Sequence, residues 1–292
     1  MRKLIVGSRE SRLAVVQSLS LVDHLKRRGV EVELVTMKTT GDRILDRTLD
    51  QVGGKGLFVK ELDQALADGR IDLAVHCLKD MPMALAPGMA ILGYSRREDP
   101  RDALVLPEGA DALKPGAVIG TSSLRRALQL KALFPGCEIR PVRGNLQTRL
   151  GKLDTGAFDA LVLAAAGLKR LGLERRISRA FGPDEIIPAA GQGILAVQGR
   201  AGEDAAWLEG YADATAAVCG RCERAFVRTL DGGCTSPVCA YAELREGRIS
   251  LRALYWDPDT GAVGTGTAEG GAEDPEAIGA GLARRLREEA RA

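Results

Sequence analysis

Two clusters of arginine and hydroxyl side chains stand in the middle of the chain. Residues 120–126 read Gly-Thr-Ser-Ser-Leu-Arg-Arg, and residues 143–149 begin with Arg-Gly-Asn and end with Thr-Arg. Guanidinium groups pair with carboxylates through two parallel hydrogen bonds, and the start of a helix offers backbone N–H groups to an anion. Two such clusters predict a site for a ligand with several carboxylates. The alternative is a solvated basic face on which the hydroxyls only cap helices.

Each cluster is predicted to lie between a strand and a helix. Residues 117–119 form an apolar strand, and leucines at helical spacing follow over 124–134. Residues 137–142 alternate like a second strand, and Arg149 lies one helical turn beyond Asn145. Ligands of open α/β sheets bind at the carboxyl ends of strands, which is where both turns fall.

Side chains at the ends of two other strands are candidates for the same kind of site. Arg9 and Ser11 follow the first strand, although Ser11 is equally a candidate N-cap of the next helix. Asp80 follows a buried strand at 71–75. Its carboxylate is either an acid–base or cation-stabilising group, or a loop aspartate that accepts backbone hydrogen bonds.

A loop lysine and a loop cysteine are further candidates. Lys55 lies near the end of a Gly-rich segment over 39–56, whose length is typical of a binding loop. The Walker spacing is absent, so we do not interpret it as a nucleotide loop. Cys234 follows Gly-Gly on a tight turn, where it is a nucleophile, an attachment point or an inert thiol. The pair Cys219 and Cys222 lies within one predicted helix and lacks the turn usual for zinc, so no metal is expected.

Composition limits the class of protein. The chain has 292 residues, of which 45% are hydrophobic and only 4% aromatic, as is typical of α/β proteins. Its 41 Lys and Arg against 39 Asp and Glu give a net charge of +2, which argues against nucleic-acid binding by bulk electrostatics. There is no apolar run long enough to span a membrane, and a predicted strand follows Met1 where a signal peptide would need an apolar core. We therefore expect a cytoplasmic protein.

The order of elements predicts an α/β fold with two lobes like those of periplasmic binding proteins, joined by two crossovers, plus a small α+β C-terminal domain. The first domain is discontinuous, with residues 1–95 and 190–209. The second domain spans 96–189 and holds the arginine clusters, and the third spans 210–292 and presents Cys234.

Seven short motifs, in order between about residue 4 and residue 256, resemble those of porphobilinogen deaminases (hydroxymethylbilane synthases). They are Arg9-x-Ser11, the segment 53–58, His76-x-x-Lys79-Asp80, the segment 97–103, the segment 120–126, Arg143-Gly144-Asn145, and the segment 188–193 followed by Gly232-Gly233-Cys234. Each motif is weak by itself, and their shared order is specific.

The resemblance implies a transferase of tetrapyrrole and haem biosynthesis. Such an enzyme joins four porphobilinogen molecules, with loss of ammonia, to a dipyrromethane cofactor held by a thioether, and then hydrolyses the chain to release hydroxymethylbilane. The cysteine that matches the attachment position is Cys234. The resemblance also implies a monomer whose partners are small molecules, without nucleic acid or membrane.

The resemblance assigns roles residue by residue. It makes Asp80 the catalytic group, because a carboxylate among arginines steers a pyrrole N–H and stabilises the cation left by deamination. The cofactor-binding residues are Cys234, Lys79, Asp80, Thr121, Ser122, Ser123, Arg125, Arg126, Arg143, Gly144 and Asn145. The substrate-binding residues are Arg9, Ser11, Lys55, Arg143, Arg149, Arg176 and Gln192.

A non-catalytic, two-lobed carboxylate-binding protein is the main alternative. It predicts reversible binding of a carboxylate and no role for Cys234. The third domain, which presents a cysteine, argues against it.

Overall fold

The computed structural model describes residues 3–43, 59–232 and 236–292. The chain divides into two compact units. The first unit contains Met1–Glu98 and Gly193–Ala217, and the second contains Asp99–Gln192 and Val218–Ala292. Each unit is described by itself below.

A five-stranded mixed sheet forms the centre of the first unit. Its strand order is β2 (Val32–Met37), β1 (Leu4–Arg9), β3 (Leu73–Cys77), β10 (Leu195–Arg200) and β4 (Met89–Tyr94). Strand β1 is parallel to β2 and β3, whereas β10 is antiparallel to β3 and β4. The carboxyl ends of β1 and β3 therefore lie at the same edge of this sheet.

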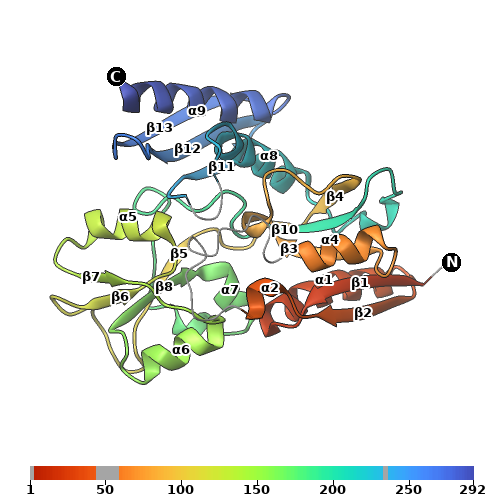
Figure 1. Ribbon diagram of the computed structural model, residues 1–292, viewed down its shortest axis with the longest axis horizontal. Helices are drawn as coiled ribbons and strands as arrows, with labels where there is room; N and C mark the ends of the chain where they lie inside the picture. The colour runs from red at the N-terminus through yellow and green to blue at the C-terminus, as the bar shows by residue number, and fades with distance from the viewer. Residues whose placement is uncertain (1–2, 44–58, 233–235) are drawn as a thin grey trace. The chain divides into compact units, whose positions relative to one another are not determined.

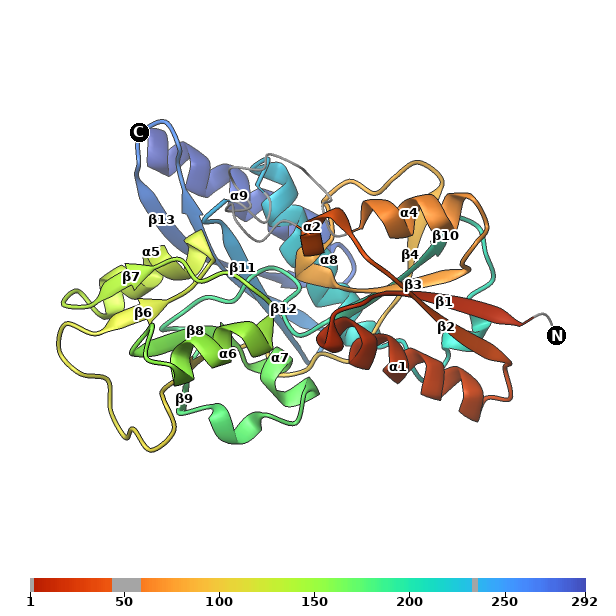
Figure 2. The ribbon, with the colours of Figure 1, turned by 60° about the horizontal axis from the view of Figure 1, so that its bottom comes forward.

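Two helices cover opposite faces of the first sheet (Figure 2). Helix α1 (Arg12–Arg27) buries Leu21 and Leu25 against one face, and α4 (Lys60–Ala67) buries Leu62 and Leu66 against the other. The short helices α2 (Thr40–Arg43) and η3 (Ala206–Leu208) also belong to this unit.

The second unit contains a sheet with the same arrangement. Its strand order is β7 (Glu138–Arg140), β6 (Val118–Gly120), β8 (Ala160–Ala164), β5 (Asp102–Val105) and β9 (Arg179–Ala180). Strand β6 is parallel to β7 and β8, and β5 is antiparallel to β8 and β9. In both sheets the antiparallel fourth strand, β10 or β5, comes directly after a crossover between the units.

The second sheet is also covered on both faces, by α5 (Leu124–Leu133) and by α6 (Leu146–Asp154), as Figure 1 shows. Strand β8 alternates as a buried strand must: Ala160 and Val162 belong to the apolar cluster under α5, and Leu161 and Leu163 to the cluster under α6. Helix α7 (Ala165–Arg170) and the turn η2 (Glu174–Arg176) follow β8.

The C-terminal part of the second unit is a three-stranded antiparallel sheet with two long helices. Its strands are β11 (Cys239–Arg245), β12 (Arg248–Trp256) and β13 (Val263–Gly271). Helix α9 (Pro275–Arg291) lies along β12 and β13, and α8 (Ala214–Thr229) precedes the sheet (Figure 1). Ile187, Cys239 and Leu254 form an apolar cluster that joins this part to the rest of the unit.

The predicted fold class is confirmed: two five-stranded α/β sheets, exchanged through two crossovers, precede a small α+β part. The limits proposed for three domains remain a prediction, and residues from Val218 onward share a compact unit with residues 99–192. Strands β4, β5 and β9 and helix α7 were not predicted. None of the helices in the described part of the chain is long and apolar enough to cross a membrane.

Candidate anion-binding site

One group of predicted site residues lies at the carboxyl edge of the first sheet. Arg9 ends β1, and Ser11 caps α1 by accepting a hydrogen bond from the Ala14 amide at 3.3 Å. Lys79 and Asp80 lie in a 3₁₀ turn, η1 (Leu78–Asp80), directly after β3. The structure thus brings these four predicted residues to one edge of the first unit, all of them half-buried.

A buried histidine lies beside this edge. His76, in β3, is 6% exposed. Burial lowers the pKa of its imidazole to about 4; a hydrogen bond with Gln198 acts in the opposite direction, and the Arg9 cation lowers the pKa further. At neutral pH the imidazole is therefore uncharged and adds no positive charge to the edge.

A second group of predicted site residues lies at the carboxyl edge of the second sheet, where two helices begin. The Ser123 hydroxyl oxygen accepts a hydrogen bond from the Arg126 amide at 3.4 Å and caps α5. The Asn145 side chain accepts the Thr148 amide at 2.9 Å and caps α6. Short polar side chains such as these accept a hydrogen bond from a free backbone amide at a helix start, which is why both residue types are common caps.

Hydrogen bonds tie the two helix starts together. The Ser122 hydroxyl donates to the Val142 carbonyl oxygen, which belongs to the other turn. The Thr121 amide donates to the Arg140 carbonyl oxygen at 3.0 Å. Both predicted clusters therefore form one continuous edge of the second unit.

The turn after β7 depends on a glycine. Gly144 has a φ of +112°, and a Cβ atom there would lie 2.6 Å from the Thr148 side chain. The Arg149 Nε donates to the Gly144 carbonyl oxygen at 2.8 Å, and the Lys152 Nζ donates to the Arg143 carbonyl oxygen at 3.2 Å. These contacts hold the turn so that Arg143 stands at the carboxyl edge.

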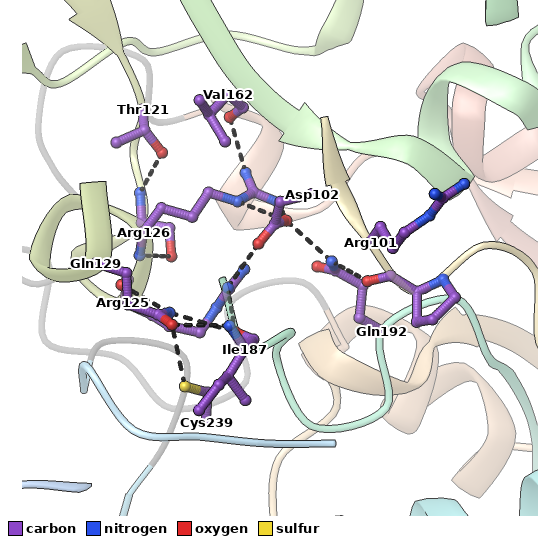
Figure 3. A network of polar contacts seen from close by, with 12 residues as sticks. Arg101, Asp102, Thr121, Arg125, Arg126, Gln129, Val162, Ile187, Gln192 and Cys239 are labelled. Carbon is purple, nitrogen blue, oxygen red and sulfur yellow. Dashed lines mark hydrogen bonds and ion pairs between the residues drawn. The ribbon is translucent and has the colours of Figure 1, made fainter. Parts of the chain in front are cut away.

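Asp102 lies at the centre of a buried network on this edge, which the sequence did not reveal (Figure 3). Its Oδ2 accepts Arg125 Nη1 at 2.6 Å, and its Oδ1 accepts Arg126 Nε at 2.9 Å. Arg125 is only 4% exposed and Arg126 6%. Each guanidinium group therefore already holds an internal carboxylate, and the assignment of both arginines to the cofactor remains a prediction.

Gln192 belongs to the same network. Its Nε2 donates to the Pro100 carbonyl oxygen at 2.6 Å and to Asp102 Oδ1 at 2.9 Å (Figure 3). Gln192 is 1% exposed, so the structure gives this predicted substrate-binding residue a structural contact between the two crossover segments. Its assignment to substrate remains a prediction.

Gln129 connects the network to the C-terminal sheet, and it too was missed. Its Oε1 accepts the Ile187 amide at 2.7 Å, and its Nε2 donates to the Cys239 sulfur at 3.8 Å (Figure 3). Burial raises the pKa of the Cys239 thiol to about 12, with Arg125 acting in the opposite direction, so Cys239 is an uncharged part of the core.

The network keeps an excess of positive charge. Burial by itself would raise the pKa of Asp102, but the adjacent Arg125 and Arg126 cations hold it well below its usual range. One ionised carboxylate beside two guanidinium groups leaves one positive charge in excess. Such a cluster suits one carboxylate of a ligand.

Arg176, a predicted substrate-binding residue, lies away from these edges. Arg176 Nη2 pairs with Asp154 Oδ1 at 2.6 Å, at the last residue of α6. The helix rises about 1.5 Å per residue, so that pair lies at the far end of α6 from the Asn145 turn. Lys55 and Cys234 lie outside the described residues.

The donor set fits a polycarboxylate ligand such as dipyrromethane, since the second unit gathers arginines, hydroxyls and helix starts on one edge. Within residues 3–43, 59–232 and 236–292, no group of three or more His, Cys, Asp or Glu side chains is arranged to hold a metal ion. Cys219 and Cys222 lie on one helix, α8, and burial raises the pKa of Cys222 to about 12.

These features define an α/β protein with two five-stranded sheets, each with a cationic carboxyl edge, and a small three-stranded sheet. Residues 4–207 match the family model described as "Porphobilinogen deaminase, dipyromethane cofactor binding domain", and residues 217–288 match "Porphobilinogen deaminase, C-terminal domain". The chain belongs to the porphobilinogen deaminase family.

Relatives of similar length support this assignment. A porphobilinogen deaminase of Ruminiclostridium cellulolyticum is 51% identical over 288 residues, which cover 98% of each chain. One from Chromobacterium violaceum is 48% identical over 296 residues, covering 98% of this chain and 94% of the relative.

Among solved structures, a substrate-binding domain of a putative amino acid ABC transporter from Streptococcus pneumoniae gives a TM-score of 0.45 at 14% identity, covering 72% of this chain and 90% of that one. A periplasmic aliphatic sulphonate binding protein from Escherichia coli gives 0.42 at 16% identity, covering 79% and 71%. Both likenesses are low, and the fold is established by the two sheets themselves.

Proposed function

We propose that this chain joins four porphobilinogen molecules, with loss of ammonia, to a covalently held dipyrromethane and then releases hydroxymethylbilane by hydrolysis. The observation that carries the proposal is the match of residues 4–207 to the cofactor-binding domain of the family. The arginine-rich edge of the second unit supports it, because a chain of pyrroles with acetate and propionate groups is a polycarboxylate.

In this proposal the side chains of the second unit bind and orient carboxylates. Arg125, Arg126 and Arg143 supply cationic N–H donors, and the start of α5 supplies backbone N–H groups. Bound dipyrromethane would supply the pyrrole carbon to which the first substrate is joined. Cys234, at the family's attachment position, is the proposed point of attachment.

The side chains of the first unit are proposed to carry the acid–base role. Asp80 is half-buried at the end of β3, and Arg9 ends the adjacent β1. A carboxylate at this position can stabilise a cationic substrate and accept a hydrogen bond from a pyrrole N–H.

The partners in this proposal are small carboxylated pyrroles and not nucleic acid, because the net charge is only +2. That the chain acts as a monomer in the cytoplasm is part of the same proposal and follows from the family resemblance.

The test is the intact mass of the full chain before and after addition of porphobilinogen. We expect a mass excess of two linked pyrrole units on the peptide that contains Cys234, together with release of ammonia and hydroxymethylbilane during turnover. A chain that stays unmodified after porphobilinogen is added, and binds carboxylates reversibly, would instead be the non-catalytic binding protein.

Asp80→Ala separates the two halves of the proposal. We expect this variant to fold and to carry the adduct while turnover falls by about a hundredfold or more. Asp111→Ala, at an exposed position of the second unit, is the control and should keep full turnover. Undiminished turnover in Asp80→Ala would remove Asp80 from the mechanism.

A further inference from the structure

Asp102 is fully buried, so it acts only through the side chains that surround it. Its exposed fraction is 0%. Besides the bonds from Arg125 and Arg126 Nε, its Oδ1 accepts Arg126 Nη2 at 2.7 Å and Gln192 Nε2 at 2.9 Å. Both carboxylate oxygens are thus occupied by protein donors, as Figure 3 shows.

Each guanidinium has a second anchor on a different strand or segment. Arg125 Nη1 also donates to the Ile187 carbonyl oxygen at 2.7 Å. Arg126 Nη1 donates to the Val162 carbonyl oxygen, in β8, at 3.1 Å. A planar guanidinium that is held at two points has a fixed orientation, so the directions of its remaining N–H groups are fixed as well.

The position of Asp102 in the fold explains why it can serve both arginines. It is the first residue of β5 and lies opposite Ala164, the last residue of β8, in the antiparallel ladder. The carboxylate therefore stands at the carboxyl edge of the sheet, below the first turn of α5, which carries Arg125 and Arg126 next to each other.

We infer that Asp102 is the positioning residue of the Arg125–Arg126 pair. It sets the direction of both guanidinium groups, so that together they bind one ligand carboxylate, and its own charge offsets one of their two positive charges. The inference rests on the proposed function, since the ligand carboxylate is that of a pyrrole. Asp102 itself touches neither substrate nor cofactor.

Asp102→Asn distinguishes this role from a role in charge alone by the direction of its effect on the rate of adduct formation. Loss of the carboxylate raises the local excess from one positive charge to two. If Asp102 only tempered that charge, a polycarboxylate would bind better and adduct formation would become faster. If Asp102 positions the arginines, adduct formation becomes slower, by about tenfold or more.

A purely structural role is tested by a matched variant. Asp257 is also a 0% exposed aspartate in the second unit, and its Oδ2 accepts Arg291 Nε at 2.9 Å and the Tyr255 hydroxyl at 2.8 Å. Asp257→Asn should lower the unfolding temperature, as Asp102→Asn does, but should leave the rate of adduct formation at the wild-type value.

Asp102→Glu provides the second variant, in case Asp102→Asn does not fold. It keeps the charge and moves the carboxylate by about 1.5 Å, one carbon–carbon bond length. We expect it to fold and to form the adduct more slowly than wild type. A charge-only role predicts the wild-type rate.

The experiment measures the unfolding temperature and the rate at which intact mass increases when porphobilinogen is added to full-length chains that were produced without it. Wild type that never gains mass refutes the proposed function, and the inference fails with it. If wild type gains mass, a rate for Asp102→Asn equal to that of Asp257→Asn, or faster, overturns the inference alone. If only Asp102→Glu folds, a wild-type rate in that variant overturns it.

Discussion

His76 is uncharged at neutral pH, so it adds no positive charge to the carboxyl edge of the first sheet. Its folded-state pKa of about 4 lies below the ordinary value of 6.5. As the pH falls, the unfolded chain binds the proton first, so His76 destabilises the fold between pH 6.5 and about 4 and has no such effect above pH 7. We expect a loss of about 2.5 kcal/mol in the free energy of unfolding between pH 7 and pH 4.5 from this residue.

Urea unfolding at the two pH values measures that loss. His76→Gln should remove this part of the pH dependence, whatever its effect on stability at pH 7. The chain's other histidine, His24, provides the control: His24→Gln keeps His76, so it should keep the loss. An equal pH dependence in wild type and His76→Gln would assign the acid loss to other groups.

At the level of single residues, the sequence predicted a cap that depends on near neighbours. Ser123 caps its helix through an amide three residues away, as predicted, and Asn145, predicted only as a turn residue, does the same. The buried role of Asp102 was not predicted, because its partners Arg125 and Gln192 are 23 and 90 residues away in the sequence. The signal that could have indicated a buried carboxylate is an aspartate at the start of β5, directly before three apolar residues.

Among the elements, the crossover segments depend on a glycine whose role is testable. Gly193 has a φ of +88°, and a Cβ atom there would lie 2.2 Å from the Glu98 carbonyl oxygen. Gly202 has a similar φ of +84°, with nothing within 4 Å of an added Cβ. Gly202→Ala should therefore lower the free energy of unfolding by about 1 kcal/mol, from backbone strain alone. Gly193→Ala should lower it by about 2 kcal/mol more, because the backbone at Glu98 must also move.

The free energy of unfolding in urea measures both variants. Equal losses in Gly193→Ala and Gly202→Ala would mean that the crossover relaxes without cost, and the close approach to Glu98 would then be unimportant for stability.

The strands that were not predicted are short or lack a periodic pattern of apolar residues. Strand β9 has two residues and β5 four, too few for an alternating pattern to appear. Strand β4 reads Met-Ala-Ile-Leu-Gly-Tyr, a continuous apolar run that fits a helix or a strand equally well. Their pairing with β5, β8 or β10 is set by the fold as a whole.

Across the whole molecule, positive and negative charges nearly balance, but positive charge is concentrated locally. The net charge is only +2, yet the second unit gathers Arg125, Arg126, Arg143 and Arg149 on a single sheet edge. Parallel strands produce this concentration, because their carboxyl ends meet and each is followed by a helix start. The sequence predicted this edge well, since it depends on strand order and not on detailed packing.

The number of cooperative units in the whole chain is a separate question. The family model of the C-terminal domain begins at residue 217, which would suggest an independent domain. However, Glu223 of α8 is 0% exposed, and its oxygens accept the Gly191 amide at 2.7 Å and the Ala242 amide at 2.8 Å. Together with the cluster of Ile187, Cys239 and Leu254, this contact predicts that the three-stranded sheet unfolds with the rest of the second unit.

Native-state hydrogen exchange in low urea tests that prediction. In wild type, amides of β8 and β12 should exchange through openings of equal free energy. Glu223→Gln replaces one carboxylate oxygen with an NH₂ group, which cannot accept a hydrogen bond from the Gly191 or Ala242 amide. The free energy of opening of β12 should then be lower than that of β8 by about 2 kcal/mol. Glu269→Gln, on the exposed face of β13, should leave the two equal. A gap already present in wild type would show that the C-terminal sheet is a cooperative unit of its own, in which case the Glu223 contacts do not couple it to the crossover.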